Sequence, residues 1–189
     1  MSIIVKNLNK SFGENKVLNN FSCEFKQEEI TCIMGASGCG KTTLLQILLG
    51  LLNADNGEFS GISDRRISVV FQENRLCSNI SSSANIRLVN QAVTKNDAAK
   101  MLKSVGLADA AAKPARELSG GMKRRVAILR ALAADCEIII LDEPFKGLDD
   151  DTKEDTMNYF KTQTIGKTVI MVTHDKNEVE FFGANVINM

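Results

Sequence analysis

Short apolar runs recur along the chain and predict buried β-strands, because a strand covered on both faces reads as nearly continuous hydrophobic residues. Residues 30–34, 137–141 and 168–172 are clear examples. Residues 21–25 instead alternate apolar and polar positions, which is typical of a strand with one face in solvent. The predicted strands are residues 2–8, 21–25, 30–34, 67–71, 137–141, 168–172 and 186–189.

Helical patterns fill the intervals between these strands. A turn-rich cluster at residues 53–57 ends the first helix. Asn96 is predicted to cap another helix, which runs to Val105 and closes at Gly106. Residues 78–90 combine a serine cluster with a short amphipathic pattern. The predicted helices are residues 41–52, 96–105, 122–134, 151–163 and 177–182.

The order of these elements predicts an α/β fold with a mostly parallel sheet. Several strands in sequence at the N-terminus predict an added antiparallel β part. Residues from about 73 to 135 contain no convincing strand, so we expect a helical subdomain inserted between two strands of the sheet. The length of the chain favours a single domain over residues 1–189.

Composition narrows the functional classes. The 23 basic and 23 acidic residues cancel, which argues against a nucleic-acid partner because such binding rests on neutralising phosphates. No stretch reaches the ~18 to 20 apolar residues of a membrane helix, and the N-terminus lacks a secretory signal pattern. Five cysteines without metal-ligand spacing indicate reduced thiols in a cytosolic protein. A single histidine excludes a histidine-based metal cluster.

A glycine-rich stretch at residues 34–50 gives the strongest chemical signal. Gly35, Gly40, Lys41 and Thr42 match the spacing G-x-x-x-x-G-K-[ST] between a predicted strand and a predicted helix. Bare amides and the helix N-terminus favour a phosphate, which Lys41 neutralises, and the Thr42 hydroxyl suits Mg²⁺. The predicted nucleotide-binding residues of this loop are Gly35, Ala36, Ser37, Gly38, Cys39, Gly40, Lys41, Thr42 and Thr43.

An apolar strand that ends in two carboxylates fits the same chemistry. Residues 138–141 are followed directly by Asp142 and Glu143. Mg²⁺ takes oxygen ligands and few of them from protein, so Asp142 suits its coordination shell. Glu143 suits a general base that polarises the attacking water.

A second glycine turn precedes the helix predicted at residues 122–134. Ser119, Gly120 and Gly121 form this turn, and the same helix-dipole reasoning predicts another anion site there. The alternative is that Ser119 only caps the helix. Because the chain has one lysine-bearing phosphate loop, the residues alone leave open what this second turn binds.

The ordered motifs resemble the ATP-binding cassette (ABC) ATPase family over nearly the whole chain. They are the phosphate loop, LSGGM at 118–122, IIILDEP at 138–144, GLD at 147–149 and THD at 173–175. The resemblance implies a P-loop NTPase core with ATP and Mg²⁺ as its ligands. It also implies a dimer of two cassettes, two copies or this chain and a paralogue, paired head to tail. Each ATP would lie between the phosphate loop of one cassette and the signature turn of the other.

Further residues take roles from this resemblance. Phe12 resembles the aromatic residue that stacks on adenine, with an ordinary core phenylalanine as the alternative. Gln72 resembles the glutamine that touches Mg²⁺ and the attacking water. His174 resembles the switch histidine that hydrogen-bonds the γ-phosphate. Residues 147–149 resemble the loop that links the two ATP sites across the dimer. The implied catalytic residues are Lys41, Gln72, Glu143 and His174, and the implied Mg²⁺ ligands are Thr42, Gln72 and Asp142.

The resemblance implies an ATPase subunit that powers a membrane ABC transporter, with import of a small anion such as a sulfonate or nitrate favoured. The implied partners are separate transmembrane permease subunits and, for import, an extracytoplasmic solute-binding protein. The chain is therefore expected in the cytoplasm, peripheral on the inner face of the cell membrane. Alkylation of Cys39, inside the phosphate loop, is expected to block ATP hydrolysis, and MgATP to protect.

Other functional classes share some of these motifs. Exporter, lipoprotein-release and cell-division cassettes look much alike at these positions. ABC proteins that act on chromosomes or ribosomes need long coiled coils or a second cassette, which this sequence lacks. A P-loop kinase would lack the LSGGM turn, and a regulator that only binds ATP would not need Glu143 and His174.

Overall fold

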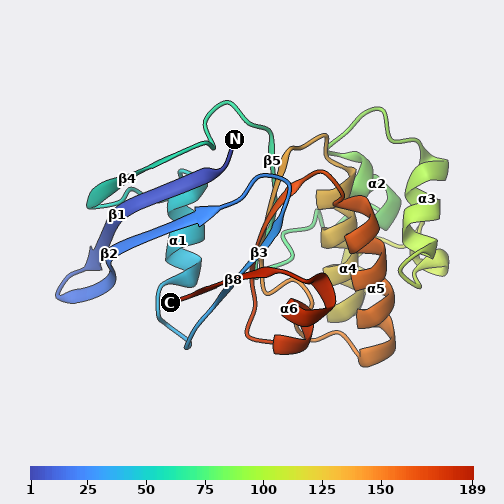
Figure 1. The fold of residues 1–189 in the computed structure, drawn as a ribbon. Coiled ribbons are helices and arrows are strands. Elements are labelled where there is room, and N and C mark those ends of the chain that lie inside the picture. The colour runs from blue at the N-terminus through green and yellow to red at the C-terminus, as the bar shows by residue number, and fades with distance from the viewer.

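The computed structural model describes all 189 residues and places the strands in two sheets. The strands are β1 (Ile3–Phe12), β2 (Asn15–Phe25), β3 (Ile30–Met34), β4 (Asn56–Ser60), β5 (Ile67–Val70), β6 (Ile138–Asp142), β7 (Thr168–Val172) and β8 (Asn185–Asn188). One sheet is parallel in the order β5-β6-β7-β3-β8, and the other is antiparallel in the order β2-β1-β4 (Figure 1). The predicted α/β fold, with its mostly parallel sheet and N-terminal antiparallel part, is confirmed.

Six α-helices connect or cover these strands. They are α1 (Lys41–Leu48), α2 (Ser82–Arg87), α3 (Lys95–Lys103), α4 (Gly120–Ala133), α5 (Asp150–Gln163) and α6 (Lys176–Phe182), with 3₁₀ turns at Ala108–Ala110 and Ala115–Glu117. None of these helices combines the length and the apolar character needed to cross a lipid bilayer.

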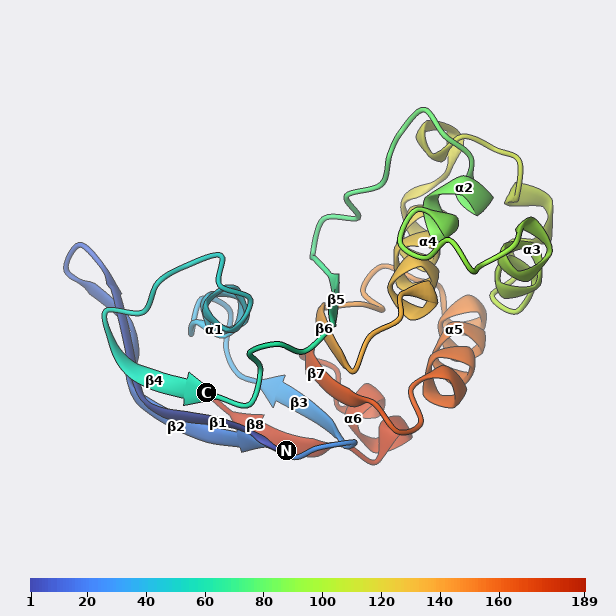
Figure 2. The same ribbon diagram turned by 90° about the horizontal axis from the view of Figure 1, so that it is seen from above.

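Both faces of the parallel sheet are buried, which explains its continuous apolar strands. In β6, Ile138 and Ile140 pack into one core cluster, while Ile139 and Leu141 pack into another on the opposite face. The first cluster joins the sheet to α1 and to the antiparallel strands, so that α1 lies between the two sheets (Figure 2). The second cluster joins the sheet to α4, α5 and α6.

A third core cluster holds α2, α3 and α4 together. Ile86 of α2, Leu102 of α3 and Leu129 of α4 are fully buried in it. The neighbouring residue of α4, Ile128, belongs to the cluster under the parallel sheet. The helix α4 therefore connects the outer helices to the sheet. Arg124, in the N-terminal half of α4, also contacts the carboxyl end of β6, as described below.

The N-terminal strands are longer than predicted. The strand predicted at residues 2–8 continues as β1 to Phe12, and the strand predicted at 21–25 begins at Asn15 as β2. Residues 53–57, predicted as a turn, lead directly into β4, which pairs antiparallel with β1. Most residues of β4 are exposed, so hydrogen bonding to β1, rather than a buried apolar pattern, defines this strand.

Helix ends also differ from the prediction. Asn96 does not cap α3; Thr94 does, because its Oγ1 accepts a hydrogen bond from the Asp97 amide at 3.1 Å while Asp97 Oδ2 accepts one from the Thr94 amide at 3.0 Å. This reciprocal pair is a capping box. The helix predicted from Met122 begins at Gly120, and the first helix ends at Leu48.

Candidate nucleotide-binding site

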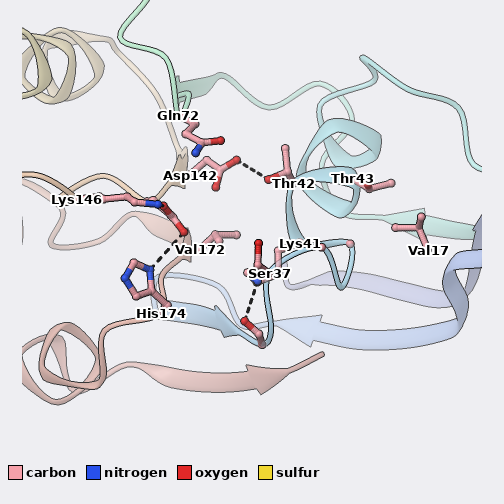
Figure 3. Close-up of a pocket in the computed structure, with 14 residues that line it drawn as sticks. Val17, Ser37, Lys41, Thr42, Thr43, Gln72, Asp142, Lys146, Val172 and His174 are labelled. Carbon is pink, nitrogen blue, oxygen red and sulfur yellow. Dashed lines mark hydrogen bonds and ion pairs between the residues drawn. The ribbon is translucent and has the colours of Figure 1, made fainter. Parts of the chain in front are cut away.

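The carboxyl ends of the parallel strands meet around an open cavity of about 420 Å³. In an α/β sheet this edge is the usual place for a ligand. The phosphate loop follows β3, Gln72 follows β5, Asp142 ends β6 and His174 follows β7, so four strands contribute to it (Figure 3). The lining residues are Val17, Gly35, Ser37, Gly38, Gly40, Lys41, Thr42, Thr43, Gln72, Asp142, Glu143, Lys146, Val172 and His174.

The phosphate loop turns tightly at Gly40. This residue has φ +104°, and a Cβ atom there would lie 2.9 Å from the carbonyl oxygen of Val17. Both facts favour glycine at this position. No side chain caps the N-terminus of α1 that follows, so its first amides stay free to bind an anion.

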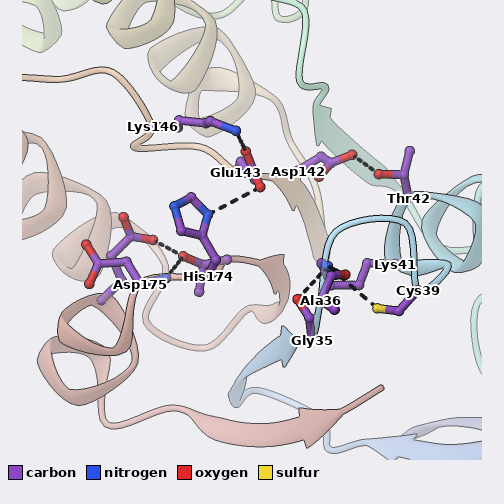
Figure 4. A network of polar contacts seen from close by, with 12 residues as sticks. Gly35, Ala36, Cys39, Lys41, Thr42, Asp142, Glu143, Lys146, His174 and Asp175 are labelled. Atoms are coloured by element: carbon purple, nitrogen blue, oxygen red, sulfur yellow. Dashed lines mark hydrogen bonds and ion pairs between the residues drawn. The ribbon is translucent and has the colours of Figure 1, made fainter.

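The Lys41 ammonium is held by the loop itself. Its Nζ donates hydrogen bonds to the carbonyl oxygens of Gly35 at 2.8 Å and Ala36 at 2.7 Å, and lies 3.6 Å from Cys39 Sγ (Figure 4). The side chain thus lies along the wall of the cavity, already close to where a bound phosphate would sit. An incoming phosphate oxygen would compete with carbonyl oxygens for the same ammonium.

Three oxygen-bearing side chains lie on one wall of the cavity. Thr42 Oγ1 donates a hydrogen bond to Asp142 Oδ2 at 2.8 Å, and Gln72 lines the same space. Burial raises the pKa of Asp142, and the hydrogen bond from Thr42 opposes that rise. A hydroxyl, a carboxylate and an amide oxygen are hard donors of the kind that Mg²⁺ prefers, so this set fits that ion.

Glu143 is held at both carboxylate oxygens. Its Oε1 lies 3.3 Å from His174 Nδ1, and its Oε2 accepts a hydrogen bond from Lys146 Nζ at 2.5 Å (Figure 4). Partial burial acts to raise the pKa of Glu143, but the hydrogen bonds and charges of Lys146 and His174 outweigh it and lower that pKa. The backbone of Glu143 has φ +48°, a region that non-glycine residues seldom adopt. Such strain is often concentrated at functional sites.

A buried network holds the segment that carries His174. Thr173 Oγ1 donates to Glu178 Oε2 at 2.6 Å, and Lys153 from α5 binds both Asp175 Oδ2 at 2.6 Å and Glu178 Oε1 at 2.7 Å. Glu178 is only 3% exposed, and its two partners satisfy its charge. The network fixes the backbone on either side of His174 and leaves the imidazole free to face the cavity.

Comparison with known proteins identifies the family. The profile of the ABC transporter family matches residues 18–146. The chain belongs to the ABC transporter family. The sulfate/thiosulfate import ATP-binding protein CysA of Escherichia coli K12 is 34% identical over 210 residues, which cover 100% of this chain and 58% of that protein. CysA of Neisseria meningitidis serogroup A is 34% identical over 199 residues, covering 94% and 56% respectively. The chain thus spans little more than half the length of these curated relatives.

Solved structures agree with this assignment. The dimeric structure of the ATP-binding cassette MJ0796 in a post-hydrolysis state, bound to ADP and Pi, superposes with a TM-score of 0.85 at 32% identity and covers 99% of this chain and 94% of that one. A bacterial Atm1-family ABC exporter with ATP bound gives a TM-score of 0.82 at 21% identity, covering 94% of this chain and 35% of that one. The second likeness concerns the fold alone.

Several predicted residues in this ABC-family chain do not line the cavity. Within the phosphate loop these are Ala36 and Cys39, whose carbonyl oxygen and Sγ respectively contact Lys41 Nζ. Ser119, Gly120 and Gly121 do not line the cavity either, and Ser119 instead caps α4 by accepting a hydrogen bond from the Met122 amide at 3.3 Å. Phe12 lies at the end of β1, is 52% exposed, and also stays outside the lining. Phe12 is therefore not a core phenylalanine.

Arg124 is a residue whose role the sequence pattern did not reveal. Its buried guanidinium donates hydrogen bonds to the backbone carbonyls of Asp142 at 2.7 Å, Pro144 at 2.9 Å and Glu143, and to that of Phe71 beside Gln72. The helix α4 is thereby tied to the segments that carry the acidic pair and the glutamine. The Arg- and Ala-rich composition of the helix indicated its existence, but not that one arginine points inward. Val17, Lys146 and Val172, which also line the cavity, were missed as well.

Proposed function

We propose that this chain is the ATP-hydrolysing subunit of an ABC transporter. The observation that carries the proposal is the convergence of the phosphate loop, Asp142, Glu143 and His174 on one cavity, while Gly120 and Gly121 of the LSGGM turn border an adjoining hollow instead. One chain therefore offers a phosphate cradle and an acid–base group but encloses the nucleotide incompletely. The structurally similar MJ0796 cassette, which is a dimer bound to ADP and Pi, supports the same interpretation.

Binding rests on the loop and the helix behind it. The amides of Gly38, Gly40 and residues 41–43, at the N-terminus of α1, surround the phosphates, and Lys41 neutralises their outer oxygens. Phe12, exposed at the end of β1, would stack on the adenine ring. Mg²⁺, held by Thr42, Gln72 and Asp142, would neutralise phosphate charge when bound.

Hydrolysis rests on Glu143 and His174. The Glu143 carboxylate accepts a proton from the attacking water, with Gln72 orienting that water. His174 hydrogen-bonds the γ-phosphate and aligns it for in-line attack. Arg124 keeps the acidic segment, the Gln72 segment and α4 in fixed relation, because its guanidinium binds carbonyls from the first two.

Two chains complete the site. Ser119, Gly120 and Gly121 of a second cassette, an identical copy or a paralogue, close over the nucleotide bound by the first, in a head-to-tail pair. Separate permease subunits contact the helical region at about residues 73–135, on the inner face of the membrane. Import of a small anion, with an extracytoplasmic solute-binding protein, is the favoured direction because the CysA relatives are named as import proteins.

A mixing experiment tests the shared site. Lys41→Ala removes the phosphate-loop cation, while Gly120→Asp puts a negative charge where the partner's nucleotide would lie. Nothing lies within 4 Å of a Cβ atom at Gly120, so Gly120→Asp should fold. Each variant alone should be inactive. A mixed dimer, however, holds one site with an intact loop and an intact signature, so an equimolar mixture should recover roughly a quarter of the wild-type rate.

No recovery, although each variant is folded and the Gly120→Asp chain binds ATP, would contradict a site shared between two copies. A control is Glu143→Gln, which should bind ATP, form a stable dimer in gel filtration and hydrolyse about a hundredfold or more slowly.

The neighbouring genes provide a separate test of the direction of transport. A permease gene beside one for an exported solute-binding protein supports import, whereas a permease gene alone would favour export.

A further inference from the structure

Lys146 forms an ion pair with Glu143, the carboxylate that the proposed reaction needs as its base. Its Nζ lies 2.5 Å from Glu143 Oε2, while Oε1 faces His174 Nδ1 at 3.3 Å (Figure 4). Both oxygens of Glu143 therefore already have a polar partner. A general base must present an oxygen to the water that it deprotonates, within hydrogen-bond reach. The Lys146 contact thus competes directly with the attacking water.

The backbone of Lys146 is anchored beside Glu143, which favours their ion pair in a chain that has not dimerised. Phe145, the preceding residue, is 1% exposed and packs against the rings of Phe160 and Phe182. The Lys146 amide also bonds the Glu143 carbonyl at 3.3 Å in a tight turn. The backbone on which Lys146 sits is therefore anchored, and its stem reaches Glu143 across a single turn.

The side chain is nevertheless free to leave. Its exposed fraction is 56%, against 17% for the Glu143 side chain, and the next residue, Gly147, has φ +76° with nothing within 4 Å of a Cβ position. Lys146 also borders the cavities around His174 and around Gly120 and Gly121. The ammonium therefore has open space to move into while its backbone stays in place.

We propose that Lys146 restrains Glu143, so that the carboxylate is unavailable as a base until the lysine side chain swings away. This inference rests on the proposed ATPase function. In the unpaired chain Lys146 keeps Oε2 occupied and basal hydrolysis slow. When a triphosphate fills the cavity, its terminal phosphate competes with Oε2 for the ammonium. Only the fraction of ATP-bound chains in which the ammonium has left the carboxylate can hydrolyse, so basal turnover stays slow.

The chemical step then needs neither a proton nor a bond from Lys146. Water loses a proton to Glu143 Oε2, its oxygen forms a bond to the γ-phosphorus, and the bond from that phosphorus to the β–γ bridging oxygen breaks to release ADP. The proton passes from Glu143 to the phosphate product or to solvent. Lys146 takes no part in the proton transfer and acts as a positioning residue, not as a catalytic one.

Steady-state kinetics test the restraint. Lys146→Met should raise the basal kcat about fivefold, which corresponds to about 1 kcal/mol, and leave the KM for ATP within about twofold because Lys41 and the loop amides supply the affinity. Lys146→Arg keeps the charge and should behave like wild type. Lys6→Met, which removes a charge from the exposed surface of β1, is the matched control. In the Glu143→Gln background, Lys146→Met should add nothing.

A second readout needs no hydrolysis. His174 is the only histidine and shares the carboxylate with Lys146, so its ring signals in the NMR spectrum of the nucleotide-free chain report on the pair. Lys146→Met should shift these signals and Lys6→Met should not. Unshifted signals, or an unchanged or lower kcat in Lys146→Met, overturn the proposal. If wild type and all variants fail to hydrolyse ATP, the proposed function is overturned instead, and the histidine signals still decide whether Lys146 holds Glu143.

Discussion

Two glycine turns lead into helices in this chain, and they differ in what surrounds them. The turn before α1 wraps around Lys41, whose ammonium binds two of its carbonyls, and α1 has no side-chain cap. The turn before α4 carries no lysine of this kind, and Ser119 caps its helix. Most residues of the first turn line the cavity, whereas Gly120 and Gly121 lie outside it. In the proposed function the first turn holds the phosphates within one chain, and the second supplies half of a site shared with a partner chain.

The difference shows how two similar sequence features acquire unequal roles. Both turns offer helix N-terminal amides, which attract anions. Only the first adds a positive side chain and a wall made by β6 and β7, so only the first can hold a phosphate within one chain. In the proposed dimer the second turn would contact the nucleotide bound by the partner chain, and the following substitutions test this difference.

The largest expected effect comes from adding one methyl group, by Gly→Ala substitution, to a glycine in each turn. Gly40→Ala forces a side chain into φ +104° and within 2.9 Å of the Val17 carbonyl, whereas a Cβ at Gly120 meets nothing within 4 Å. Such strain costs of order 1–3 kcal/mol and distorts the loop. We expect Gly40→Ala to weaken ATP binding by the isolated chain by about a hundredfold and Gly120→Ala to leave it unchanged. Titration with a fluorescent ATP analogue measures both, and equal losses would contradict the comparison.

Alkylation of cysteine gives the next largest effect. Cys39 is half-buried inside the phosphate loop, while Cys77 is exposed beyond Gln72. Burial raises the pKa of Cys23 and Cys32 to about 12, so both stay unreactive at about pH 8. Modification of Cys39 should lower ATP hydrolysis at least about tenfold, because the adduct fills the phosphate cradle.

The control for alkylation is Cys39→Ser. In that variant Cys77 still reacts, and hydrolysis should survive the reagent. MgATP should protect the unmodified chain in proportion to its binding. Mass spectrometry that finds Cys39 fully labelled in a chain with undiminished turnover would refute the placement of bound phosphate beside this residue.

The sequence predicted those parts of the molecule in which local pattern and burial agree. The apolar strands β3, β6 and β7 are buried on both faces, so a hydrophobic run sufficed to locate them. The residue spacing of the phosphate loop and the carboxylates after β6 likewise located the cavity. By contrast β4 has few apolar residues and is a strand because β1 offers it hydrogen-bond partners, which no local pattern records.

Contacts between distant segments account for the remaining misses. Arg124 binds carbonyls 18 to 53 residues away in sequence, so its inward direction depends on how α4 docks on the sheet.

Local spacing, by contrast, could have revealed two further features. The capping residue of α3 could have been predicted, because Thr94 followed three residues later by Asp97 is the capping-box pattern. The Glu143–Lys146 pair was also signalled by its spacing of three residues, but the pairing depends on the turn at Pro144 and Phe145.

A smaller effect is expected at the exposed end of β1. Phe12 is 52% exposed, and Lys10 Nζ lies 5.6 Å from the centroid of its ring. If the ring stacks on adenine, Phe12→Ala should weaken ATP binding about fivefold, since such stacking is worth ~1 kcal/mol, and should leave the unfolding midpoint unchanged. Leu51→Ala, at a site that is 60% exposed, is the control. Identical affinities for ATP and for inorganic triphosphate in wild type would argue against the stacking role.

The smallest effect concerns the second turn alone. Ser119 Oγ accepts a hydrogen bond from the Met122 amide at the N-terminus of α4, and loss of such a cap costs about 1 kcal/mol. Ser119→Ala should therefore lower the free energy of unfolding by that amount in urea, whereas Ser119→Asp, which also accepts the bond and suits the helix dipole, should not. ATP affinity of the isolated chain should be the same in both variants, because Ser119 lies outside the cavity. If the second turn serves only as a helix cap, Ser119→Asp hydrolyses ATP as fast as wild type; if it contacts the partner's phosphates, the added negative charge slows hydrolysis while stability is kept.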